Sequence, residues 1–213
     1  MTALPYRLIR ANRKTIALRV EYDGSLLVRA PKRCPKYEID KFVISQRQWI
    51  EKRRAALKNF EENHPQGTIA YLGKIYQIIK NETNETEVKI SGDKIYTPSE
   101  NALQDFLYRE AAKVIKPKIL HYVNIMRVTP RQAKLSDART RWGSCSSKKN
   151  INLSWRLVFC PLPVIDYVVV HELSHLTYMN HSKEFWARVE EILPNYKIEQ
   201  RWLKINGKLL TML

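Results

Sequence analysis

Apolar and polar residues alternate in two short stretches near the start of the chain, at positions 15–22 and 25–30. Alternation with a period of two is typical of a strand that buries one face. The dipeptide Asp23-Gly24 lies between the two stretches and favours a tight turn, because both residue types tolerate a positive φ angle. The pattern therefore predicts a β-hairpin over residues 15–30.

A helical period follows this hairpin over residues 36–63. Apolar side chains recur there three or four positions apart, which places them on one face of a helix. Basic residues occupy the opposite face, so we predict one long amphipathic helix with a basic outer surface. The apolar positions are Ile39, Phe42, Val43, Trp49, Ile50, Leu57 and Phe60, and the basic positions are Lys41, Lys52, Arg54 and Lys58.

Several short apolar stretches predict further strands before a break at Pro98. A helical period begins after this break and continues to about residue 126, although Pro117 can kink such a helix. We therefore divide the chain into a β-rich N-terminal region, residues 1–98, and a second domain, residues 99–213. The predicted strands cover residues 69–72, 74–79, 88–90 and 94–96, and a polar stretch connects them over residues 81–87.

The second domain combines a small sheet with helices, which makes the fold class α+β. Pro161 and Ser182 each mark the start of a helix, and Pro194 ends the second one. The predicted elements are strands at 133–141 and 151–159, a turn at 143–144, and helices that begin near 162, 183 and 197.

Three of the five histidines lie within eleven residues, and two of them are four positions apart inside the helix that Pro161 begins. His171 and His175 thus lie one turn apart on one helix face, so both imidazoles can reach one ion. Glu172 lies about 100° further around the axis. Its carboxylate can reach a metal-bound water there without binding the metal, which is the geometry of the HExxH zinc hydrolases.

The third ligand is less strictly specified. His181 follows His175 at the spacing of the longer motif HExxHxxGxxH, but Tyr178 occupies the glycine position of that motif. Asn180 tolerates the left-handed conformation and could reverse the chain, so we favour His181. The competing third ligands are Glu184, Glu190 and Glu191.

Three neutral imidazoles would hold one Zn²⁺ ion tetrahedrally and leave the fourth position open for water. The ion lowers the pKa of that water to about 7, and Glu172 then acts as the general base. Arg141 and Tyr178 are candidates for contacting negative charge that develops on the substrate. Gly143 and Ser144 could offer backbone donors, although this segment could equally brace a turn beneath the helix.

Charge is the most unusual property of the composition. The net charge is +16, and residues 1–60 hold fifteen Lys or Arg against five acidic residues. Such a surface attracts polyanions such as nucleic acid, nucleotides or anionic lipid headgroups, or it is simply a solvated face. No apolar run approaches the roughly 20 residues of a membrane span. With three unpaired cysteines and no secretion signal, we expect a cytoplasmic protein.

Five segments carry a resemblance to a known family. They are Asn12–Val20, Val28–Pro31, Arg141–Ser146, Ile165–Leu176 and Asn180–Trp186. Together they resemble the YgjP-like family of metal-dependent hydrolases. The resemblance implies a zincin-like fold in the C-terminal domain, related to the SprT and WLM metallopeptidases. It also implies that the metal ligands correspond to His171, His175 and His181, and that the catalytic acid corresponds to Glu172.

Three functions are compatible with these observations. The first is a zinc-dependent metallopeptidase. The second is a metal-dependent nucleoside triphosphate pyrophosphohydrolase, because the resembling family has also been linked to triphosphate hydrolysis and the basic region would suit that substrate. The third is a nucleic-acid-binding module with a structural metal. A structural zinc normally has four protein ligands, so three ligands beside an acid argue against this last function.

Overall fold

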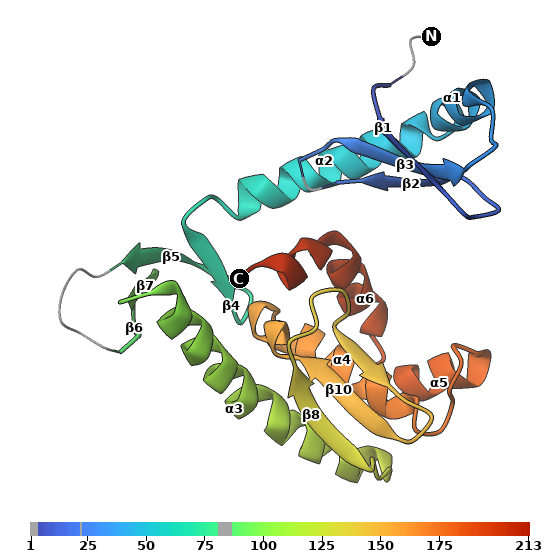
Figure 1. The fold of residues 1–213 in the computed structure, drawn as a ribbon. Helices are drawn as coiled ribbons and strands as arrows, with labels where there is room; N and C mark the ends of the chain where they lie inside the picture. The colour runs from blue at the N-terminus through green and yellow to red at the C-terminus, as the bar shows by residue number, and fades with distance from the viewer. Residues whose placement is uncertain (1–3, 22, 81–86) are drawn as a thin grey trace. The chain divides into compact units, whose positions relative to one another are not determined.

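The computed structural model describes residues 4–21, 23–80 and 87–213 (Figure 1). The predicted polar connection over residues 81–87 therefore lies almost wholly outside the described residues, as does Tyr22. Within the described part, the fold is α+β, with three small sheets and six α-helices. The chain forms two compact units, Met1–Asn63 and His64–Leu213.

The first unit contains a three-stranded sheet with the order β1-β3-β2. The predicted hairpin is confirmed, because β2 and β3 pair antiparallel around Asp23 and Gly24. The Asp23 carboxylate accepts the Ser25 N–H at 2.9 Å, and Gly24 has a φ angle of 77°. The strands are β1 (Arg7–Ala11), β2 (Ala17–Val20) and β3 (Leu26–Pro31), and β1, which the pattern did not predict, runs parallel to β3.

The single long helix predicted over residues 36–63 is two helices, α1 (Lys36–Ser45) and α2 (Arg47–Asn63). They meet at Gln46, whose N–H is shared between the carbonyls of Phe42 and Val43, at 3.2 Å each. This sharing tightens the last turn of α1 and ends it. Trp49, which the pattern placed on the apolar face of the helix, is 46% exposed.

Apolar residues of β3 form the core of the first unit with the two helices. Leu26, Val28 and Ala30 are buried against Ile39, Val43 and Ile50 of α1 and α2. Because side chains alternate along a strand, the residues between these three lie on the opposite face of the sheet.

The second unit begins with a four-stranded sheet of order β4-β5-β7-β6, which confirms the strands predicted there. Its strands are β4 (Thr68–Tyr71), β5 (Lys74–Lys80), β6 (Lys89–Ser91) and β7 (Lys94–Thr97).

The turn between β4 and β5 packs against the start of a later helix. Leu72 and Gly73 both have positive φ angles, and the Leu72 N–H donates to the Val158 carbonyl at 2.7 Å. A Cβ atom on Gly73 would lie 2.7 Å from Cγ of Pro161, so only glycine fits. These contacts tie β4 and β5 to the second unit, so the structure divides the chain after residue 63 and not near 98, where the sequence suggested a boundary.

Six helical segments and a second sheet, of order β8-β10-β9, complete this unit. The strands are β8 (Gln132–Ser136), β9 (Gly143–Cys145) and β10 (Asn150–Ser154). The α-helices are α3 (Glu100–Met126), α4 (Leu162–Ser174), α5 (Lys183–Ile192) and α6 (Tyr196–Ile205). The 3₁₀ helices are η1 (Trp155–Phe159) and η2 (Gly207–Thr211). Pro117 lies inside α3, which continues through it.

Three details of the second sheet differ from the prediction. The strand expected over residues 133–141 is shorter and ends at Ser136. The turn expected at residues 143–144 is strand β9, and the chain turns after it, where Lys149 has a φ angle of 60°. The strand expected over residues 151–159 ends at Ser154 and continues as η1. All side chains of η1 are buried, so its apolar run reflects burial on every side and not a strand period.

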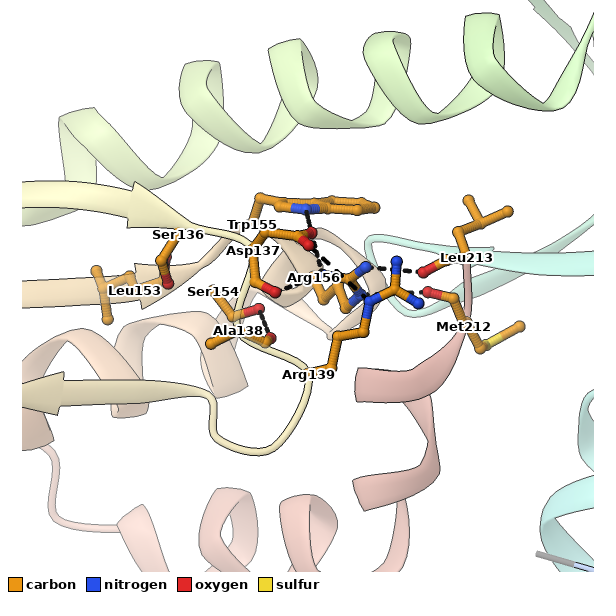
Figure 2. Close-up of polar contacts among 10 residues, drawn as sticks. All are labelled: Ser136, Asp137, Ala138, Arg139, Leu153, Ser154, Trp155, Arg156, Met212 and Leu213. Carbon is orange, nitrogen blue, oxygen red and sulfur yellow. Dashed lines mark hydrogen bonds and ion pairs between the residues drawn. The ribbon is translucent and has the colours of Figure 1, made fainter.

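A buried arginine anchors the segment that leads from β8 toward β9 (Figure 2). Arg156 is fully buried, and its guanidinium donates to the Asp137 carboxylate at 2.6 Å and to the backbone oxygen of Leu213 at 2.7 Å. The Trp155 indole N–H donates to the same carboxylate at 2.8 Å. The Ser154 hydroxyl donates to the neighbouring Ala138 carbonyl at 2.7 Å, so this stretch is fixed by several bonds.

Helix α4 lies among the other elements of the second unit and is buried along most of its length. It contacts α3, α5, α6 and strand β9. An ion pair between Lys118 of α3 and Asp166 of α4, with N–O distances of 2.7 and 2.8 Å, joins the two helices where both residues are largely shielded from water. Among the described residues, no helix is long and apolar enough to span a bilayer.

Candidate metal centre

Three histidines meet at the end of α4. One ring nitrogen of each of His171, His175 and His181 lies within 4.8 Å of the others. The Nε2 atoms of His171 and His181 are 3.1 Å apart. Two nitrogens that bind one zinc ion tetrahedrally at about 2.0–2.1 Å are separated by about 3.3 Å. The His171–His181 pair thus has the spacing that a shared metal ion requires, and three imidazoles are a donor set that fits such an ion.

The His175 ring is held by the turn that follows α4. Its Nδ1 lies 3.0 Å from the Tyr178 carbonyl, which can only accept a hydrogen bond. Nδ1 therefore carries the proton, and Nε2 is left with a lone pair for a metal. The Tyr178 N–H donates to the Ser174 carbonyl at 3.0 Å, which closes this turn. Asn180 is not among the described residues with a positive φ angle, so the expected left-handed reversal there is wrong.

The His171 ring contacts a tyrosine one turn earlier on the same helix. Its Nδ1 lies 3.5 Å from the Tyr167 hydroxyl, and that hydroxyl accepts a hydrogen bond from Gln200 of α6 at 3.4 Å. A proton on Nδ1 would leave Nε2 of His171 free to face His181. This arrangement orients the ring in the way that outer contacts orient metal-binding histidines.

Stacked aromatic rings hold His181, which is itself exposed. Trp186 of α5 stacks on His181, with ring centroids 5.5 Å apart and 23° between the planes. Tyr196 stacks on the other side of Trp186 at 5.4 Å, and Tyr167 stacks on Tyr196 at 6.1 Å. The stack thus runs from His181 to the tyrosine that contacts His171.

Phe185 lies beneath all three histidine rings. Its ring centroid is 4.5–4.9 Å from each of the three, and the side chain is fully buried. The predicted N-cap places it there, because the Ser182 hydroxyl accepts the Phe185 N–H at 3.5 Å and starts α5 directly after His181.

Burial keeps two of the histidines neutral. Burial, reinforced by the neighbouring His175 and His181, lowers the pKa of His171 to about 3. Burial also lowers the pKa of His175, although the bond to the Tyr178 carbonyl opposes this effect. A neutral imidazole is the form that binds a metal.

Glu172 is buried beside the cluster. Burial raises the pKa of its carboxyl to about 7, and the positive charge of Arg141 opposes the rise. The side chain lies against β9, because a Cβ atom on Gly143 would be 2.6 Å from Oε1 of Glu172. The predicted helper Arg141 is therefore close enough to act electrostatically on this carboxyl.

β9 is an edge strand, and the backbone groups on its outer edge pair with no backbone group of the described residues. The ladder to β10 uses the N–H and C=O groups of Ser144, so those of Gly143 and Cys145 point away from β10. In an antiparallel pair, every second residue bonds to the partner strand. Trp142 accepts from the Ser154 N–H at 2.8 Å and Ser146 donates to the Asn150 carbonyl at 2.9 Å, so the bonded residues are 142, 144 and 146.

The remaining predicted site residues take different places. Gly143 and Cys145 face α4, so the Ser144 side chain lies on the opposite face of the sheet, away from Glu172. Tyr178 contributes its backbone carbonyl to His175. The thiol of Cys145 has a pKa raised by burial and by the charge of Glu172, so it is not an activated nucleophile.

The competing acidic ligands are not part of the cluster. Among the described residues, the group that could hold a metal consists of the three histidines alone. Glu184 is exposed and forms a hydrogen bond with Ser182, and Glu190 and Glu191 pair with Lys197 and Arg188 on the surface.

Sequence reasoning missed the residues that orient the histidines, namely Tyr167, Trp186, Tyr196 and Gln200. One of them carried a usable signal, because Tyr167 lies four positions before His171 and so on the same helix face. The others come from α5 and α6, and the sequence does not indicate which faces of those helices meet the site.

An HExxH helix whose histidines meet a third histidine, beside a sheet with an open edge strand, is the architecture of a zincin-type metallopeptidase domain. The chain belongs to the YgjP-like family, whose metallopeptidase domain matches residues 14–206. No curated protein matches it.

Two solved structures are similar to part of the chain, and both are metallopeptidase zymogens. One is abylysin of Pyrococcus abyssi, which is 21% identical with a TM-score of 0.38 over 42% of this chain and 92% of that chain. The other is jannalysin of Methanocaldococcus jannaschii, which is 21% identical with a TM-score of 0.38 over 45% of this chain and 96% of that chain.

Proposed function

We propose that the protein is a zinc-dependent metallopeptidase in which His171, His175 and His181 hold the ion and Glu172 is the general base. The observation that carries this proposal is that Glu172, which follows the cluster residue His171 on α4, lies against Gly143 of the edge strand β9. One carboxylate thus lies next to both the metal ligands and a surface suited to a peptide backbone.

The edge of β9 favours a peptide over a nucleotide. An extended peptide can add to an exposed strand by pairing its own N–H and C=O groups with those of the strand. Gly143 and Cys145 offer both kinds of group on the outer edge. A triphosphate has no hydrogen-bond donors to pair with the carbonyls of the strand. Among the described residues, Arg141 is the only cation that acts on Glu172, which is little positive charge for a triphosphate.

The chemistry assigned to this chain is a proton transfer at Glu172. A bound zinc ion would supply Lewis acidity, which polarises a carbonyl and lowers the pKa of water. The Glu172 carboxylate accepts a proton from the attacking water as the new C–O bond forms. It then gives this proton to the amine nitrogen as the C–N bond breaks, which balances the hydrolysis. Arg141 favours the charged form of Glu172 before the transfer.

The test is mass spectrometry of zinc-loaded protein incubated with a pool of unstructured peptides and nucleoside triphosphates. We expect the wild type to cleave peptides and Glu172→Gln to retain zinc without cleaving them. Asp105→Asn, an exposed acid-to-amide change on α3, serves as the matched control and should cleave like the wild type.

Other outcomes would reject the proposal. Conversion of triphosphate to monophosphate that depends on Glu172, without peptide cleavage, would establish nucleotide chemistry. Retained zinc with no turnover of either substrate class by the wild type would indicate a structural ion.

A further inference from the structure

A groove of about 310 Å³ lies in the first unit, between the edge strand β2 and helix α2. We call it the Trp49 groove. It combines one aromatic ring and two guanidinium groups with two aliphatic side chains. Its lining residues are Leu18, Arg19, Val20, Trp49 and Arg53.

Trp49 and Arg53 are presented together on α2. They are four positions apart, so they project from the same helix face. Trp49 is 46% exposed, although tryptophan is costly to leave in water. Arg53 is exposed, and it forms no ion pair or hydrogen bond with the described residues. The helix thus offers a flat ring with an unneutralised cation one turn away.

Arg19 lies on the other wall of the groove. It pairs with Glu21 at 3.4 Å, and its side chain is 62% exposed. Such an exposed pair contributes little to stability, so Arg19 can exchange Glu21 for a stronger anion. A phosphate within the groove would therefore meet arginines from both β2 and α2.

Positive charge continues from the groove across the sheet face opposite the helices. In the strand register, Arg7 and Arg19 both pair with Leu27, and Arg29 lies two residues further along β3. All three arginines are exposed, one on each strand. Residues 1–63 hold fifteen Lys or Arg against seven acidic residues, a net charge of +8. A polyanion that leaves the groove would therefore remain on a basic surface.

We propose that the Trp49 groove binds single-stranded nucleic acid, with one base stacked on Trp49 and the adjacent phosphates held by Arg19 and Arg53. Binding of single strands combines a basic groove with exposed aromatic rings, because every base has a face that can stack. A duplex keeps its bases stacked internally and cannot offer one to Trp49. An anionic membrane is disfavoured, because the apolar face of α2 is buried in the core and cannot insert. This inference does not depend on the metal centre.

The test is fluorescence anisotropy of a labelled oligodeoxythymidylate titrated with the full chain in EDTA, at several salt concentrations. We expect Trp49→Ala to weaken binding by about tenfold, and Trp49→Phe to retain most of the affinity. Arg53→Gln should weaken binding and reduce the slope of log affinity against log salt by about 0.7. Because Trp49 and Arg53 are exposed, we expect these variants to fold, and circular dichroism checks this.

The matched control is Lys36→Gln, which removes an exposed charge at the first residue of α1, outside the residues that line the groove. It should change the affinity and the salt slope less than Arg53→Gln does. Equal effects of these two substitutions would mean that the oligonucleotide is attracted by the overall positive charge. That result would overturn the proposal that the Trp49 groove is the binding site. Unchanged binding by Trp49→Ala would also overturn it. So would tighter binding of a duplex of equal length, or binding of phosphatidylserine vesicles without binding of the oligonucleotide.

Discussion

Gly143 of β9 lies against the side chain of Glu172 on α4, so closely that a Cβ atom at position 143 would stand 2.6 Å from both Cγ and Oε1 of the glutamate. Gly143 is not among the glycines with a positive φ angle, so space and not backbone conformation requires glycine here. This approach brings the outer edge of β9 next to the proposed general base.

We expect Gly143→Ala to lower peptide hydrolysis strongly, because the added Cβ atom would push β9 and the Glu172 side chain away from each other. The strain should also cost about 1–3 kcal/mol of unfolding free energy. Peptide turnover and urea denaturation measure the two effects. Gly207→Ala is the control, since no atom lies within 4 Å of the added Cβ. Wild-type turnover and stability in Gly143→Ala would show that the contact is easily relaxed.

Removing one imidazole tests the metal ligands. We expect purified His175→Ala to retain no zinc, because two histidines cannot complete the site and the ring is fixed for binding by the Tyr178 carbonyl. Metal analysis by mass spectrometry after dialysis measures the content. His121→Ala, which removes an exposed histidine of α3, should retain zinc like the wild type. Stoichiometric zinc in His175→Ala would refute the assignment.

The histidine cluster could be predicted from the sequence because its three residues lie within eleven positions of one another. The four-residue spacing on α4 aligns His171 with His175, and the N-cap at Ser182 sets where the chain returns after His181. These contacts span few residues, so elementary helix geometry is enough to bring them together.

Other features depend on partners that are distant in sequence. Gly143–Cys145 is a strand only because β10 pairs with it, and its own residues suggested a turn. Residues 155–159 are buried on every side, so their apolar run could not distinguish a strand from a 3₁₀ helix. The break between α1 and α2 at Gln46 was also not predictable, because apolar residues continue at helical spacing on both sides of it.

Trp186 is predicted to position His181 for the metal. His181 is exposed, and the stacked indole is one of the contacts that limit its rotation, together with the ring of Phe185. We expect Trp186→Ala to weaken zinc binding by about 10–100-fold, as loss of a contact that orients a ligand does. Competition with a chromophoric chelator measures the affinity. Trp186→Phe keeps a stacking ring and should recover most of it. If the phenylalanine variant binds zinc as weakly as the alanine variant, stacking is not the cause.

The contact between Asp137 and the buried Arg156 makes a prediction about stability in acid (Figure 2). Hydrogen bonds from Arg156 and Trp155 lower the pKa of Asp137. Because the folded pKa lies below the unfolded value of about 3.9, the carboxylate stabilises the fold above that value. This contribution is lost as the pH falls through the folded pKa.

Asp137→Asn should therefore lower the unfolding free energy at neutral pH by about 1 kcal/mol, because Arg156 loses its charged acceptor but the Asp137 side chain is 62% exposed and screened by water. The difference from the wild type should begin to shrink below about pH 4, where the unfolded carboxyl takes up a proton, and should be lost once the pH is below the lowered folded pKa of Asp137. Urea denaturation across this pH range measures both values, with Asp105→Asn as an exposed control. A difference that stays constant into acid would contradict this prediction, because it would mean that the protonated carboxyl of Asp137 stabilises the fold as well as the carboxylate does.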